Sequence, residues 1–127
     1  MEKLVIIPTY NESENISAIL NAIFGLDKDY HVLVVDDNSP DGTASIVKSL
    51  QRQYPNQLFL EQRAEKRGLG TAYIHGFKWA IDKGYRYIFE MDADFSHNPQ
   101  DLERLYESCR FGADLAIPEE VVTVESA

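Results

Sequence analysis

The 127-residue sequence has one cysteine, Cys109, and no long apolar run. An intramolecular disulfide needs two cysteines, so none can form within the chain, and this favours a reducing, cytoplasmic setting. The N-terminal stretch MEKLVIIPTYNE has only four apolar residues in a row before Pro8, too few for a signal peptide. No segment approaches the length of a membrane span. We therefore expect a soluble, cytoplasmic chain.

Basic residues are also scarce. Lysine and arginine total 12 against 21 aspartate and glutamate residues, which gives a formal net charge of −9. This charge disfavours binding to a nucleic-acid backbone or an anionic membrane surface through bulk electrostatics. An anionic ligand, such as a nucleotide, would need local basic residues or a divalent cation to reverse the sign at its site.

Several common site patterns are missing as well. The three histidines have no His-x-x-His spacing, so a zinc site is unsupported, and no Gly-x-Ser-x-Gly nucleophile elbow occurs. Gly68-x-Gly70 resembles the start of a dinucleotide fingerprint, but Tyr73 stands where the third glycine belongs. The motif also follows the third expected strand rather than the first, which argues against NAD binding.

The apolar pattern predicts a single α/β domain. Apolar runs alternate with stretches of helical periodicity, and the 44% hydrophobic content is enough for one core. The expected strands are 4–9, 30–37, 57–62, 85–92 and 113–117, and the expected helices are 14–24, 41–54, 70–84 and 99–112. This alternation predicts a mostly parallel, Rossmann-like sheet with helices on both faces.

Polar segments follow four of the expected strands: PTYNE, DDNSPDG, EQRAEKRGLG and DADFSHNP. Ligands of open α/β sheets bind beyond the carboxyl ends of the strands, so we expect these segments to form one site. Asp92 and Asp94 end the fourth strand, and Asp-x-Asp suits Mg²⁺ or Mn²⁺, which prefer carboxylate and phosphate oxygens. The alternative is that these acids cap the following helix or are solvated.

Two further segments have open interpretations. Turn and helix-start chemistry explains residues 38–42 but leaves Asp36 and Asp37 without a structural need, so one of them could accept hydrogen bonds from a base or ribose. A phosphoacceptor receiver domain also has an acidic pair, but after its first strand. Arg63, Lys66 and Arg67 precede a glycine-bearing helix start that could bind phosphate, or they form a solvated basic turn.

Taken together, IPTYNESENI, VVDDNSPDGT, KRGLGTAYIHGFKWA and MDADFSHNPQDL resemble the inverting glycosyltransferases of family 2, which have the GT-A fold. Within that family they are most similar to the polyprenol (dolichyl) phosphate mannosyltransferases. The resemblance implies transfer of mannose from GDP-mannose to a polyprenyl phosphate, dependent on Mg²⁺ or Mn²⁺. An acceptor phosphate is already ionised, so little or no general base is needed.

The resemblance also implies roles for individual residues. Asp92 and Asp94 would be the catalytic pair, with Asp94 and Ser96 at the metal. The implied nucleotide-sugar contacts are Pro8, Tyr10, Glu12, Val35, Asp37, Arg67, Asp92 and Ala93. Ser96 departs from the family, which often has a longer glutamine there.

The last residues depart further. After ADLAI the family continues with an arginine that reaches the diphosphate and with an acceptor-binding half, whereas this sequence reads PEEVVTVESA. We therefore expect residues 1–117 to form a nucleotide-sugar-binding half-domain and 118–127 a divergent acidic tail. An inactive nucleotide-sugar-binding fragment and a UDP-sugar-using enzyme are the alternatives. A homo-oligomer would cover exposed sheet surface, and a full-length form would bind peripherally at the cytoplasmic face of the membrane.

Overall fold

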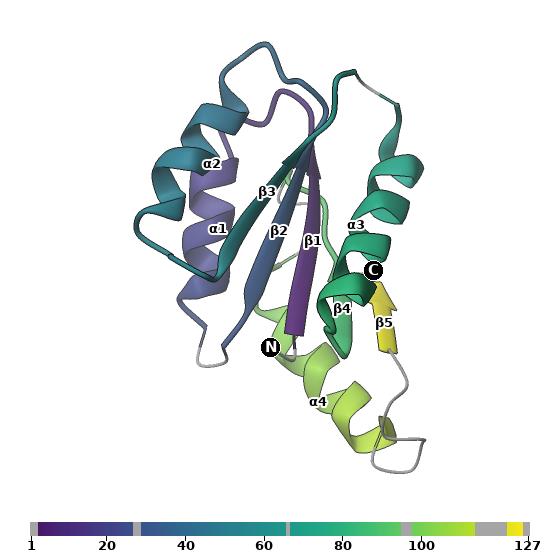
Figure 1. The fold of residues 1–127 in the computed structure, drawn as a ribbon. Helices are drawn as coiled ribbons and strands as arrows, with labels where there is room; N and C mark the ends of the chain where they lie inside the picture. Colours follow the sequence, from purple (N-terminus) through teal and green to yellow (C-terminus); the bar gives the residue numbers. More distant parts are fainter. Residues whose placement is uncertain (1–2, 27–28, 66, 95–97, 114–121, 126–127) are drawn as a thin grey trace.

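The computed structural model describes residues 3–26, 29–65, 67–94, 98–113 and 122–125. Strands and helices alternate along the chain (Figure 1). The strands are β1 (Lys3–Thr9), β2 (His31–Asp36), β3 (Leu58–Gln62), β4 (Tyr87–Glu90) and β5 (Val122–Glu125). The helices are α1 (Ile16–Phe24), α2 (Thr43–Gln51), α3 (Leu69–Lys83) and α4 (Asp101–Ala113).

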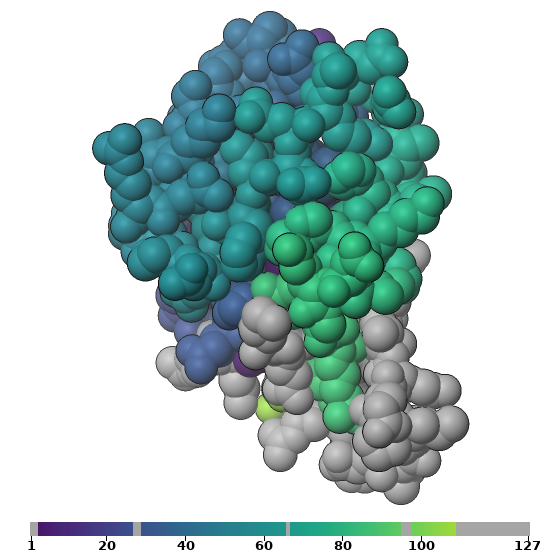
Figure 2. Space-filling model, viewed as in Figure 1, coloured from purple at the N-terminus to yellow at the C-terminus, as the bar shows by residue number. Residues whose placement is uncertain are grey.

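The five strands form one parallel sheet in the order β3-β2-β1-β4-β5. All seven residues of β1 are buried, as are five of the six in β2. Continuous burial, rather than alternation, is typical of parallel strands covered on both faces. In the space-filling view of Figure 2, teal and green side chains meet over the sheet and hide nearly all of β1. The carboxyl ends of the central strands are therefore held by a rigid core.

The two faces of the sheet carry separate apolar clusters. Val5 and Ile7 face a cluster that includes apolar residues of α1, α2 and α4. Leu4 and Ile6, the alternate residues of β1, face a cluster with α3. Figure 1 shows α1 and α2 on one side of the sheet and α3 on the other. Because one residue of slip would exchange these faces, the two clusters fix the register of β1.

Helix α3 lies very close to β1 because its inner face is built from small residues. Ala72, Gly76 and Ala80 are buried and recur every fourth residue, so they share one face of the helix. A Cβ added at Gly76 would lie 2.6 Å from Cγ2 of Ile6. That methyl group branches from the Cβ of a strand residue and cannot swing away freely. The close approach therefore depends on Gly76.

Gly76→Ala is expected to lower the free energy of unfolding despite the higher helix propensity of alanine. Overpacking costs typically about 1–3 kcal/mol, against about 1 kcal/mol gained in propensity. Gly70→Ala is the matched control, because nothing lies within 4 Å of a Cβ added there. Urea unfolding of the two variants checks this prediction. The prediction is wrong if Gly76→Ala and Gly70→Ala raise the urea midpoint of unfolding equally.

The first four strands and the four helices confirm the α/β fold expected from the sequence. The fifth strand differs. Ala113, expected to begin that strand, is the last residue of α4, and residues 114–117 lie outside the described part of the chain. The observed β5 lies at Val122–Glu125, within the expected tail, and pairs parallel to β4. A short apolar run such as ADLAI does not distinguish a strand from the end of a buried helix.

No helix in the described ranges is both long enough and apolar enough to cross a membrane.

Candidate functional site

A pocket of about 310 Å³ opens at the carboxyl ends of β1, β2 and β4, beside the first turn of α3. Seven of the residues predicted for the ligand site line it: Pro8, Tyr10, Glu12, Asp37, Asp92, Ala93 and Asp94. The other lining residues are Thr9, Gly68, Leu69 and Ala72. All four polar segments that follow the expected strands therefore contribute to one pocket, as the topology of the sheet predicts.

Three predicted residues are not placed in the pocket lining. Val35 is fully buried and packs in the cluster beneath α3. The Arg67 side chain is exposed, and its Nε lies 3.7 Å from Oε1 of Glu65. Ser96 lies outside the described residues, as do Lys66 and His97.

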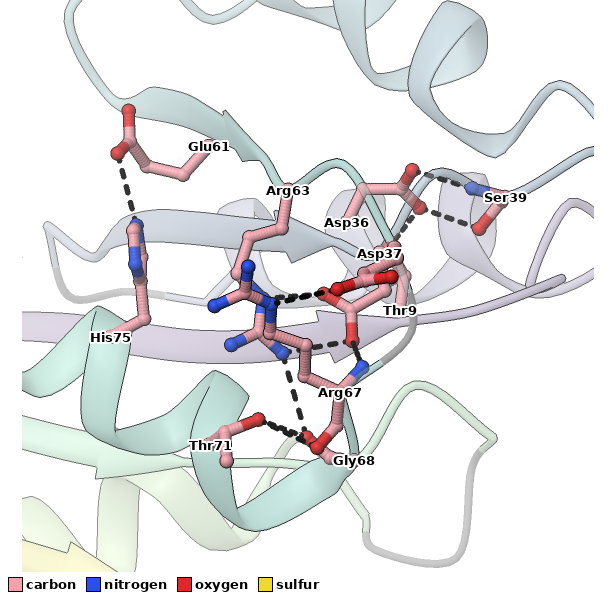
Figure 3. A network of polar contacts seen from close by, with 11 residues as sticks. Thr9, Asp36, Asp37, Ser39, Glu61, Arg63, Arg67, Gly68, Thr71 and His75 are labelled. Atoms are coloured by element: carbon pink, nitrogen blue, oxygen red, sulfur yellow. Dashed lines mark hydrogen bonds and ion pairs between the residues drawn. The ribbon is translucent and has the colours of Figure 1, made fainter.

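Asp37 is held by a buried ion pair (Figure 3). Arg63 donates from Nε to Oδ1 at 2.6 Å and from Nη2 to Oδ2 at 2.8 Å. The backbone N–H of Arg67 donates to Oδ2 at 3.2 Å. Burial raises the pKa of Asp37, but the hydrogen bonds from Arg63 and Arg67 and their positive charges outweigh it, so the pKa lies below its usual value. Arg63 therefore neutralises Asp37 and anchors the loop that leads to α3.

Asp36 has a different set of partners. It is fully buried and accepts hydrogen bonds from Oγ1 of Thr9 at 2.7 Å, from the backbone N–H of Ser39 at 3.0 Å and from Oγ of Ser39 at 2.6 Å. The carboxylate thus ties the end of β1 to the loop after β2. The expectation that Asp36 and Asp37 lack a structural need is wrong, because both carboxylates accept hydrogen bonds that hold loops in place. Most of these donors are distant in sequence, so the sequence pattern did not reveal them.

The loops after β1 and β2 are joined to each other. The backbone N–H of Asn11 donates to Oγ of Ser39 at 2.9 Å, and that of Glu12 donates to Oγ1 of Thr43 at 3.0 Å. Asp41 accepts from the N–H groups of Ser13 and Thr43 and from the Thr43 hydroxyl, and these bonds lower its pKa to about 2. This mesh fixes the direction of the pocket-lining segment 8–12.

The loop before α3 contributes backbone as well as side chains. Gly68 lines the pocket with φ at 96°, a conformation that residues with a Cβ rarely adopt. Its carbonyl accepts hydrogen bonds from Oγ1 of Thr71 at 2.9 Å and from Nη2 of Arg63 at 3.5 Å (Figure 3). The glycine was noted in the sequence, but its backbone geometry is visible only in the structure.

Three carboxylates, those of Glu12, Asp92 and Asp94, make the pocket strongly acidic. Burial is the main cause of a raised pKa at Glu12, and the negative charges of Asp94, Asp41 and Asp92 add to it despite a hydrogen bond with Asn15. A cluster of negative charges that raises the pKa of Glu12 also favours the binding of a cation among these carboxylates.

The donors fit Mg²⁺ or Mn²⁺ in the way these ions usually bind. Within the described residues, no group of three His, Cys, Asp or Glu side chains is arranged to hold a metal ion alone. These ions commonly use one or two carboxylates and complete their coordination with water and substrate phosphate oxygens. Asp92 and Asp94 on one short segment match that donor set.

Tyr73 is a residue of this site that the sequence analysis did not assign. Its hydroxyl, on α3, donates a hydrogen bond of 2.7 Å to Oδ1 of Asp92. Burial, together with this hydrogen bond and the charge of Asp92, raises the pKa of Tyr73. An aromatic residue at helical spacing is usually a core residue, so its sequence position gave no signal of the contact.

Comparison with known proteins agrees with this geometry. A polyprenol monophosphomannose synthase of Mycolicibacterium smegmatis is 47% identical over 114 residues, covering 90% of this chain and 43% of that protein. An undecaprenyl-phosphate mannosyltransferase of Micrococcus luteus is 46% identical over 117 residues, covering 92% of this chain and 47% of that protein. The chain thus spans less than half the length of these relatives.

Two solved structures are similar in fold. A mannosyltransferase of Pyrobaculum calidifontis, in complex with GDP-Man and Mn²⁺, has a TM-score of 0.59 and 35% identity, covering 62% of this chain and 24% of that one. S. aureus TarS 1–349, in complex with UDP-GlcNAc, has a TM-score of 0.71 and 28% identity, covering 90% of this chain and 31% of that one. Residues 4–123 match the family model described as glycosyl transferase family 2, so this chain, with its GT-A fold and acidic pocket, belongs to the family 2 glycosyltransferases.

Proposed function

We propose that this chain binds a nucleoside-diphosphate sugar together with a divalent cation, and that it serves transfer of mannose from GDP-mannose to a polyprenyl phosphate with inversion. One observation carries the proposal: the Asp92–Asp94 segment lies in the same pocket as Tyr10, Glu12 and Asp37. The names of two similar relatives, a polyprenol monophosphomannose synthase and an undecaprenyl-phosphate mannosyltransferase, support the choice of acceptor.

The pocket residues divide into two groups in this proposal. Pro8, Tyr10 and Asp37 line the side nearest β1 and β2 and would contact the base and ribose. Asp92, Ala93 and Asp94 line the side at β4 and would meet the diphosphate and sugar, with Asp94 as the main metal ligand. When bound, Mg²⁺ or Mn²⁺ neutralises the diphosphate and makes it a better leaving group.

The reaction places few demands on acid–base groups. An oxygen of the acceptor phosphate forms a bond to the anomeric carbon while the bond from that carbon to the diphosphate oxygen breaks. A single displacement of this kind inverts the anomeric centre. The acceptor oxygen is already ionised, which suits a pocket whose described lining contains no histidine or lysine.

Acceptor binding is a separate part of the proposal. The similar relatives are more than twice as long as the segments matched here, as their coverage of 43% and 47% shows. We assign acceptor binding mainly to the part of such proteins that this chain does not span. The nucleotide-sugar site is the part of the proposal that residues of this chain can test.

A UDP-sugar is the second candidate donor. TarS, whose structure contains UDP-GlcNAc, has the higher TM-score of the two structures compared, although its identity is lower. A chain that binds the donor without transferring it is the other alternative. Both alternatives use the same pocket. The UDP-sugar alternative differs from the main proposal in base preference, and the binding-only alternative differs in lacking turnover.

The thermal midpoint with GDP, UDP or GDP-mannose, each with and without Mn²⁺, tests the proposal. Binding to the native state at 100-fold excess over Kd stabilises by about 2.7 kcal/mol, which raises the midpoint of a domain this size on the order of 10 °C. We expect the largest shift with GDP-mannose and Mn²⁺, and its loss in Asp94→Ala. Asp82→Ala, an exposed acid in the last turn of α3, is the control and should leave the shift intact.

No shift with any nucleotide, with or without Mn²⁺, would contradict the proposal. A larger shift with UDP than with GDP would favour the second candidate donor. Ligand-dependent shifts without sugar transfer to a polyprenyl phosphate would favour the binding-only alternative.

A further inference from the structure

Asp37 and Asp92, which line the pocket after β2 and β4, have partners of different charge. Asp37 is paired with the Arg63 guanidinium through two hydrogen bonds. Asp92 accepts its hydrogen bond of 2.7 Å from the neutral hydroxyl of Tyr73. The first pair sums to zero charge, whereas the second retains a full negative charge. The contact with Tyr73 therefore leaves the negative charge of Asp92 uncancelled.

The Tyr73 hydroxyl is held in place by the packing of its helix. Ala72, its neighbour in sequence, is buried and lines the pocket, and Gly76 brings α3 against Ile6 of β1. The Tyr73 ring is partly buried against the apolar cluster of that face. A tyrosine side chain has two main torsions, so a ring fixed by packing also fixes the position of its hydroxyl. The Tyr73 hydroxyl, the hydrogen-bond donor to Asp92, is therefore in place before any ligand binds.

Within the part of the chain that the structure describes, the hydrogen bond from Tyr73 orients the Asp92 carboxylate without saturating it. An ionised carboxylate offers about four lone-pair positions, and the bond at Oδ1 uses one of them. Asp92 is half-buried at the pocket wall. Without the hydrogen bond from Tyr73, its carboxylate would be freer to rotate. Preorganised groups of this kind bind more tightly because the ordering cost falls on the protein fold rather than on ligand binding.

We propose that Tyr73 is a positioning residue for Asp92: its hydroxyl fixes the orientation of the carboxylate and leaves its charge and remaining lone pairs to the ligand and cation in the pocket. The inference rests on the proposed function of that pocket. Tyr73 itself is not among the residues that line the pocket, so it acts through Asp92.

Tyr73→Phe tests the inference because it removes the hydroxyl and keeps the ring. We expect the thermal midpoint of the ligand-free chain to stay close to wild type and the Kd for GDP with Mn²⁺, measured by calorimetry, to rise about tenfold. The matched control is Tyr85→Phe, which removes a hydroxyl that lies 2.7 Å from Nδ1 of His31 at the opposite end of the sheet. That variant should leave the Kd unchanged.

A double-mutant cycle separates positioning from a general structural effect. If Tyr73 acts through Asp92, then Tyr73→Phe should change the Kd about tenfold in the wild-type background and less than twofold in Asp92→Ala, with titrations extended to millimolar ligand. Equal losses in both backgrounds, or no loss in the wild type, would overturn the inference while leaving the proposed function in place. A wild-type chain that binds no nucleotide would remove both.

Discussion

Replacing Arg63 with methionine is expected to destabilise the fold by about 3–5 kcal/mol, the usual cost of leaving one member of a buried ion pair without its partner. The Arg63 and Asp37 side chains are only 10% and 7% exposed, so water cannot replace the lost guanidinium. The same substitution frees the carbonyl of Gly68 from one of its donors. Urea unfolding at pH 7 measures the loss.

The size of this effect should depend on pH. The pKa of Asp37 is lowered in the folded wild type, so the stabilisation is fully present above the unfolded pKa, near 4, and is lost as pH falls through the folded value. In Arg63→Met the buried carboxylate lacks its cation and is protonated more easily. We therefore expect the difference in unfolding free energy between wild type and variant to narrow as pH falls below about 5.

Two variants act as controls for the Arg63 prediction. Arg67→Met removes an exposed side chain whose Nε lies 3.7 Å from Oε1 of Glu65, which is also exposed, and should change stability little. Arg63→Met combined with Asp37→Asn removes the uncompensated charge and should recover part of the loss. A double variant as unstable as Arg63→Met alone would show that the cost comes from packing and not from the unpaired charge.

The fold was predictable because local signals agreed with one another. The strands β1 and β2 are largely apolar runs, and the helix between them, α1, has apolar residues at helical spacing. A sequence that alternates in this way can bury both kinds of element only as a covered parallel sheet. The start of the fifth strand at Ala113 was wrong, because Ala113 is the last residue of α4. A short apolar run has too few residues for its periodicity to distinguish a strand from a helix.

The acidic pair at the pocket was predictable for the same reason. Asp92 and Asp94 follow a buried strand, where a charge without a ligand has little structural reason to stand, and the topology of the sheet places them beside Glu12 and Asp37. Their chemical roles remain predictions. The place of the site depends on the parallel direction of the strands, which the sequence pattern does indicate.

The contacts that support the pocket were not predictable. Arg63 lies 26 residues from Asp37, and its position suggested a phosphate-binding helix start or a solvated basic turn rather than an ion pair. Tyr73 lies 19 residues from Asp92 and fits the apolar face of a helix. Each pairing depends on how closely an element packs on the sheet, and local periodicity does not report that distance.

The fully buried Asp36 carboxylate should have the second large effect, and one that reaches the pocket. It accepts from Thr9 and from two donors of Ser39, and Oγ of Ser39 accepts in turn from the backbone N–H of Asn11. Tyr10 and Glu12, on either side of Asn11, line the pocket. The carboxylate thus connects the core to the pocket-lining segment through the hydroxyls of Thr9 and Ser39.

Asp36→Ala is therefore expected to lower the free energy of unfolding by about 2–4 kcal/mol, because buried donors lose a charged acceptor and a small cavity forms. It should also weaken binding of GDP with Mn²⁺. Ser39→Ala isolates the second effect: it keeps the contact between Thr9 and Asp36 but removes the hydroxyl that holds Asn11, so it should cost less stability while still weakening binding. Urea unfolding and calorimetry on both variants separate these effects. If Ser39→Ala left the Kd unchanged, the bond from Asn11 to Ser39 would not be needed to hold the loop after β1, which also bonds to Thr43 and Asp41.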